Sequence, residues 1–132
     1  MRYWMGLGMK KSVLVVLCVL PLLNSEAKVI TVDDDGPADF RTIAEAINVS
    51  ANADTILVKA GTYSQRIAFN NKAVRLTSEN PDDPSVVKAT IITAASGYSV
   101  SFDLQEGNDS ILTGFTITGR GIRCYGTSPT IS

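Results

Sequence analysis

The chain has 132 residues, with 12 basic and 13 acidic side chains and no histidine. Without an imidazole it cannot carry Ser-His-Asp or Cys-His catalysis, or a zinc site with a histidine ligand. Its charges form neither a basic stripe nor a polybasic run, so we expect no nucleic-acid partner and no attachment to an anionic membrane surface.

Residues 1–27 are predicted to be a secretory signal peptide. Three basic residues precede an apolar run from Val13 to Leu23, and Ser25-Glu26-Ala27 has small residues at the two positions that a signal peptidase reads. A membrane anchor is the alternative, but the run is shorter than the roughly 20 residues that span a bilayer, and it contains Pro21. We therefore expect cleavage after Ala27, a secreted, periplasmic or cell-surface location, and no membrane attachment afterwards.

Residues 28–132 are predicted to form one small domain. They carry nine basic and twelve acidic side chains, a net charge of −3. Cys124 is their only cysteine, so no disulfide can form within the domain.

The domain is predicted to begin with a strand, an acidic loop and a helix. Val29 to Val32 is short, apolar and β-branched, as expected for a strand. Thr42 and Glu45 have the spacing of a capping box, and the apolar residues that follow Thr42 share one face. We therefore expect a short amphipathic helix over residues 43–51.

The acidic loop between them could be a metal site or a structural turn. With Gly36 as the central glycine of a calcium-binding loop, Asp33 and Asp35 fall on ligand positions, but Thr31 and Thr42 occupy the first and last positions. Such a ligand set is incomplete. We interpret the stretch as an end-cap loop made of turn-forming residues, and we assign no metal to it.

After residue 52 the sequence is expected to contain only strands and turns, in a repeating pattern. One predicted apolar column has steps of 26 and then 22 residues and comprises Val74, Leu76, Val100, Phe102, Ile122 and Cys124. A second column joins Ile111 to Ile131, 20 residues later. Repeats of this length made of strands and short turns predict a parallel β-helix.

The alternation within these strands predicts which side chains face out. The column residues should point inward, so Cys124 is expected to be a small buried apolar residue rather than a reactive thiol. The outward residues are then Arg75, Ser101, Asp103, Arg123 and Tyr125.

Several phrases resemble secreted bacterial proteins of the right-handed parallel β-helix group with the pectin-lyase-like fold. The phrases are "DTILVKAGTY", "AVRLTSENPDDPSVVKATIIT", "LTGFTITG" and "GIRCYGTSPTIS", and the resemblance covers residues 29–132. The opening "ITVDDDGPADFRTIAEAI" also resembles the start of pectin methylesterases, where a strand, a loop and a helix close the solenoid. The resemblance implies an all-β right-handed parallel β-helix with a short N-terminal capping helix, but no single activity.

In the related polysaccharide enzymes, aspartates and arginines on one outward face of later coils carry the chemistry. The corresponding outward residues here are Asp103, Arg120 and Arg123, but the paired-aspartate phrases of those enzymes are missing. We therefore assign no catalytic residue and no cofactor. Tyr63 matches a turn phrase of the family and is expected to pack, whereas Tyr125 is left open between packing and sugar contact.

Three hypotheses for function remain. The first is an exported β-helix module that contacts polysaccharide or another extracellular partner without catalysis. The second is the N-terminal fragment of a polysaccharide lyase, hydrolase or esterase, and the third is a truncated reading frame without independent activity. Because residues 131 and 132 correspond to the middle of a coil, we also expect an incomplete last coil that self-associates.

The signal-peptide hypothesis predicts that the exported protein begins at Lys28, because Ser25-Glu26-Ala27 follows the apolar run at the distance that signal peptidase requires. N-terminal sequencing of protein collected outside the cytoplasm tests this directly. Secreted material that retains the leader would contradict the hypothesis.

Overall fold

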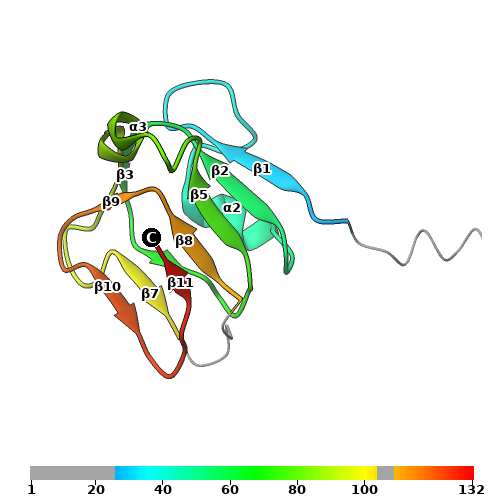
Figure 1. Ribbon diagram of the computed structural model, residues 1–132, viewed down its shortest axis with the longest axis vertical. Helices are drawn as coiled ribbons and strands as arrows, with labels where there is room; N and C mark the ends of the chain where they lie inside the picture. The colour runs from blue at the N-terminus through cyan, green and yellow to red at the C-terminus, as the bar shows by residue number, and fades with distance from the viewer. Residues whose placement is uncertain (1–25, 104–108) are drawn as a thin grey trace, which may run out of the picture.

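The computed structural model describes residues 26–103 and 109–132, so the predicted leader lies almost wholly outside the described residues. The described part consists mainly of short parallel strands, with two short helices (Figure 1). None of its helices has the length and apolar character needed to cross a membrane.

The strands form three sheets, which we call A, B and C. Sheet A has the order β1 (Val29–Val32), β2 (Thr55–Val58), β5 (Arg75–Ser78), β8 (Ile111–Thr113) and β11 (Thr130–Ile131). Sheet B has the order β3 (Gly61–Ser64), β6 (Thr90–Thr93) and β9 (Thr116–Ile117). Sheet C has the order β4 (Ile67–Ala68), β7 (Val100–Phe102) and β10 (Ile122–Cys124).

The chain passes through sheets A, B and C in turn, which makes each circuit one coil of a solenoid. The coils are β2-β3-β4, β5-β6-β7 and β8-β9-β10, after which β11 returns to sheet A. All strand pairs are parallel and join equivalent strands of successive coils. The predicted fold class, an all-β parallel β-helix with a short N-terminal helix, is confirmed.

The interior of the solenoid is filled by side chains stacked in register. In sheet A, Ile56 pairs with Leu76 and Leu76 with Leu112, and all three are buried. In sheet C, Val100 lies in register with both neighbouring strands, and the rings of Phe69 and Phe102 stack with their centroids 4.4 Å apart. Because each inward side chain meets its counterpart in the next coil, the apolar core runs along the whole solenoid.

The predicted columns are partly wrong in their pairing. The step from Val100 to Ile122 is confirmed, but Leu76 belongs to sheet A and pairs with Leu112, not with Phe102. The second coil contains an inserted helix, so its length differs from that of its neighbours, and the 26-residue step from Leu76 leads from sheet A to sheet C. Ile131 likewise pairs with Leu112, which places the predicted second column one residue out of register.

Cys124 is the second correction. It lies in register with the inward-facing Phe102, as predicted, yet its side chain is exposed rather than buried. In the described part β10 is the edge strand of sheet C, so no further strand covers it.

Helix α2 (Ile43–Val49) closes the N-terminal coil, two residues shorter than predicted. Its N-cap forms as the sequence indicates, because the Thr42 hydroxyl accepts a hydrogen bond from the Glu45 N–H at 3.2 Å. The helix buries its apolar face beside β1 and β2 (Figure 1). The Lys72 ammonium group donates to the last-turn carbonyls of Ile47 and Asn48 at 2.6 and 2.7 Å.

Two further elements differ from the sequence prediction. Helix α3 (Pro84–Ala89) lies within a stretch expected to contain only strands and turns. Asp83 is its N-cap residue, and the Asp83 carboxylate accepts a hydrogen bond from the Ser85 N–H at 2.8 Å. The first residue of the helix is a proline, which is favoured at that position. None of its residues is buried, so it left no amphipathic pattern in the sequence. The "GTY" phrase, expected to form a turn, forms β3.

The Lys72 contacts predict that Lys72→Met destabilises the protein by about 1 kcal/mol, because two carbonyls at the negative end of α2 lose a cationic donor. Lys59→Met is the matched control, since the Lys59 side chain forms an exposed ion pair with Glu79, at 3.9 Å, and does not cap a helix. Chemical denaturation of both variants measures the difference. Equal stabilities would show that the cap does not support the helix.

Candidate functional site

The turns that lead into sheet C carry a stack of basic and aromatic side chains. Arg66, Tyr98 and Arg120 precede β4, β7 and β10 in three successive coils. Gly97 and Gly121 have left-handed backbone conformations, with φ of 75° and 84°, which lets the turns bend sharply without strain. A Cβ at Gly97 would make only ordinary contact with the Arg66 guanidinium carbon, at 3.4 Å, so the turn requires glycine for its backbone conformation and not for space.

Tyr98 is the centre of this stack. The guanidinium carbons of Arg120 and Arg123 lie 5.0 and 5.8 Å from the centroid of its ring, within the range of cation–π attraction. Both arginines come from the coil after that of Tyr98. The half-buried ring therefore orders two cationic side chains on the outside of the solenoid.

The outer face of sheet C continues from this stack. Arg123 Nη2 lies 2.9 Å from Asp103 Oδ1, and both side chains are about half exposed. The next outward residue, Tyr125, is 61 % exposed. We call the set Tyr98, Asp103, Arg120, Arg123 and Tyr125 the sheet C face.

The structure brings the outward candidates together. Asp103, Arg120 and Arg123, which the sequence indicated together as outward residues, all lie on the sheet C face. Tyr98 was not singled out. The sequence feature that could have identified Tyr98 is its 22-residue separation from Arg120. This equals the step from Val100 to Ile122, so Tyr98 and Arg120 lie at the same point of successive coils.

Tyr63 lies on the inside of the solenoid. Its side chain is 2 % exposed, and its hydroxyl donates to the Lys59 carbonyl at 2.9 Å. Burial raises the pKa of Tyr63 to about 12, and the nearby Asp34 carboxylate adds to the effect. Tyr63 therefore has no ring face available to a sugar.

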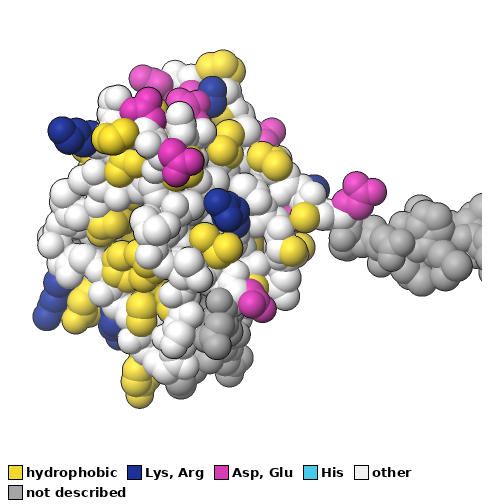
Figure 2. Space-filling model, in the orientation of Figure 1, with side chains coloured by type: hydrophobic (Ala, Val, Ile, Leu, Met, Phe, Trp, Pro, Cys, Tyr) yellow, Lys and Arg dark blue, Asp and Glu magenta, His cyan; other side chains and the backbone are white. Residues whose placement is uncertain are grey.

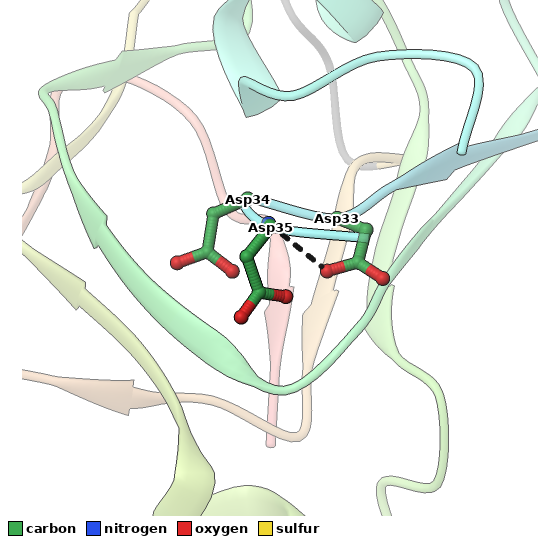
Figure 3. A group of neighbouring side chains, drawn as sticks. All are labelled: Asp33, Asp34 and Asp35. Atoms are coloured by element: carbon green, nitrogen blue, oxygen red, sulfur yellow. Dashed lines mark hydrogen bonds between the residues drawn. The ribbon is translucent and has the colours of Figure 1, made fainter. Parts of the chain in front are cut away.

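The acidic loop brings three carboxylates together (Figure 3). One oxygen from each of Asp33, Asp34 and Asp35 lies within 4.8 Å of the other two, which is close enough to ligate a single cation. Asp33 Oδ1 also accepts from the Asp35 N–H at 3.4 Å. A Cβ at Gly36 would meet the end of the Asp33 side chain, which would have to move to make room for it.

Hydrogen bonds within the protein account for the shape of the loop. The Thr31 and Phe40 backbones are joined at 3.1 Å, and the Asp39 carboxylate accepts from the Thr31 N–H at 2.9 Å and from its hydroxyl at 3.0 Å. These bonds lower the pKa of Asp39, the backbone bond most strongly. Acidic side chains also gather toward the α3 end of the face shown in Figure 2.

No family model matches the chain, and neither the curated proteins nor the solved structures gave a match. The three parallel sheets with their recurring strand order are those of a parallel β-helix. The finer assignment to the pectin-lyase-like group rests on the resemblance of the sequence phrases.

We expect calcium to leave the melting temperature unchanged, because Ca²⁺ takes six to eight oxygen ligands and the loop brings together one oxygen from each of three carboxylates. Thermal melts with and without millimolar calcium test this, since any ion bound by the native state raises the melting temperature. A rise that Asp35→Ala abolishes would establish a metal site in the loop.

Proposed function

We propose that the chain is an exported β-helix module of the pectin-lyase-like type, and that its sheet C face contacts an extracellular polysaccharide without catalysis. The observation that carries the proposal is Tyr125. Of the aromatic residues that the structure describes, it alone is exposed, and it lies on the same face as the Arg123–Asp103 ion pair.

The chemistry of this face suits a sugar. An exposed tyrosine offers an apolar ring for the C–H face of a pyranose and a hydroxyl at its edge. Arg123 supplies N–H donors and Asp103 supplies acceptor oxygens, and both side chains are about half exposed. An aromatic platform beside charged donors and acceptors can bind a ring and orient its hydroxyls.

The repeat of the solenoid favours a polymer over a small sugar. Successive coils are about 4.8 Å apart, so groups at equivalent positions form a ladder along the axis. Tyr98 and Arg120 occupy two such positions in consecutive coils, because Val100 and Ile122, two residues further along, are in register. An extended chain laid along that direction meets Tyr98 in one coil and Arg120 in the next.

The face has little capacity for hydrolysis. Glycoside hydrolysis generally uses two carboxyl groups on either side of the scissile bond. Among the described residues of the sheet C face, Asp103 is the only carboxylate, and it is paired with Arg123. Binding is therefore the function that this set of side chains supports best.

One observation favours the enzyme alternative. An arginine and an aspartate on one outward face are what the resemblance implies for related lyases, hydrolases and esterases, and Arg123 and Asp103 are such a pair. In that case the sheet C face belongs to a larger catalytic surface. Turnover of pectate or pectin by this chain that is lost in Arg123→Ala would favour this alternative over a binding module.

We expect the secreted protein to be retained by at least one acidic or neutral plant or bacterial polysaccharide, and Tyr125→Ala to weaken that binding about tenfold, equivalent to about 1.4 kcal/mol. The reason is the loss of the exposed ring. Affinity electrophoresis in gels that contain each polymer measures the retardation.

Val49→Ala is the matched control, because Val49 is another exposed apolar side chain but lies on α2 and is not part of the sheet C face. It should bind as the unmodified protein does. Retention by no polymer in the panel, or equal retention of Tyr125→Ala and the control, would contradict the proposal.

A further inference from the structure

The residue that follows the predicted cleavage point is held against a buried carboxylate. The Lys28 backbone nitrogen donates to Asp54 Oδ1 at 2.8 Å, and the Lys28 carbonyl accepts from the Thr55 N–H at 2.8 Å. Asp54 is 1 % exposed, and its second oxygen accepts from the Ala51 N–H at 2.8 Å. Both backbone groups of Lys28 are thus fixed beside the start of β2.

Removal of the leader changes the charge of this nitrogen. Hydrolysis of the Ala27–Lys28 bond by a leader peptidase consumes one water, releases Ala27 with a carboxylate and leaves Lys28 with an α-amine. At neutral pH most of that amine is protonated, because the usual pKa of an α-amino group is about 7.7 to 8.0. The nitrogen already bonded to Asp54 becomes an ammonium group, and the hydrogen bond becomes charge-assisted.

We propose that Asp54 is the receptor for the mature N-terminus, so that cleavage after Ala27 creates an ion pair between the Lys28 α-ammonium and Asp54 that fastens β1 to the solenoid. The proposal rests on the predicted export cleavage and is independent of any ligand of the sheet C face. Export processing would then stabilise the first coil in the compartment where the protein works.

The surroundings of Asp54 suit this role. The pKa of Asp54 lies below its usual value, first because of the hydrogen bonds from the Ala51 and Lys28 backbones and then because of the Lys28 and Lys72 side-chain charges. The Lys72 ammonium group is itself bound to two carbonyls of α2. The carboxylate is therefore ionised at neutral pH and directs one oxygen at the Lys28 nitrogen.

The two partners define a pH window for the stabilisation. The folded pKa of Asp54 is lowered, so its contribution is present above the unfolded value of about 3.9 and is lost as pH falls through the folded pKa. The α-amine gains a partner, so its folded pKa is raised. Its contribution is complete below about 8 and is lost as pH rises through the folded pKa.

The test compares the protein that begins at Lys28 with a version that begins one residue earlier, at Ala27. In the longer version the Lys28 nitrogen is an amide, which keeps the hydrogen bond to Asp54 but carries no charge. Each version is made with and without Asp54→Asn, and the four form a thermodynamic cycle. The readouts are the melting temperature between pH 5 and 10 and the α-amine pKa by NMR titration.

We expect the version that begins at Lys28 to melt higher at pH 7, and the difference to disappear at pH 10 and in Asp54→Asn. Its α-amine should titrate at least one pH unit above that of the Ala27 version, a tenfold higher proton affinity. Equal α-amine pKa values in the two versions with Asp54 intact would overturn the proposal, and this comparison needs no substitution that could unfold the protein. Secreted protein that begins elsewhere than Lys28 would overturn it as well.

Discussion

Ile56, Leu76 and Leu112 lie directly above one another because the parallel strands of sheet A pair without offset. This stacking is the constraint on which the other features depend. A shift of one residue in any strand would turn its buried side chains outward and its polar ones inward. The in-register stack therefore determines which side chains of sheets B and C face solvent, including those of the sheet C face.

The stack also determines where glycine and small polar residues are needed. In sheet A, Ser78 is the last residue of β5 and is covered by Gly114 of the next coil. A Cβ at Gly114 would collide with the Ser78 side chain and with Pro81, and Gly114 has a left-handed φ of 81°. Within the described residues the buried Ser78 hydroxyl has no hydrogen-bond partner, which costs about 1 to 3 kcal/mol. Close contact between coils is maintained here despite that cost.

Much of the fold could be predicted because the signals are local. Alternating β-branched residues predicted β2 and β7, and the Thr42 capping box predicted α2. Pairing between coils could not be predicted in the same way, because the inserted helix α3 makes the coils unequal in length. A 26-residue step therefore linked Leu76 to Phe102, although the two residues belong to different sheets.

The site was less predictable than the fold. Outward alternation identified Asp103, Arg123 and Tyr125 one by one, and their proximity depends on the register of β7 with β10. Tyr98 and its two guanidinium neighbours come from turns, whose positions follow from coil lengths rather than from alternation. Burial of Cys124 was wrongly expected, because a strand has a covered face only where another element covers it.

The register of sheet A is the central claim, and backbone NOE contacts between neighbouring strands test it most directly. We expect contacts between the backbone protons of Leu76 and those of both Ile56 and Leu112. Backbone contacts from Leu76 to Phe102 would instead place β5 beside β7, and would contradict the three-sheet solenoid described here.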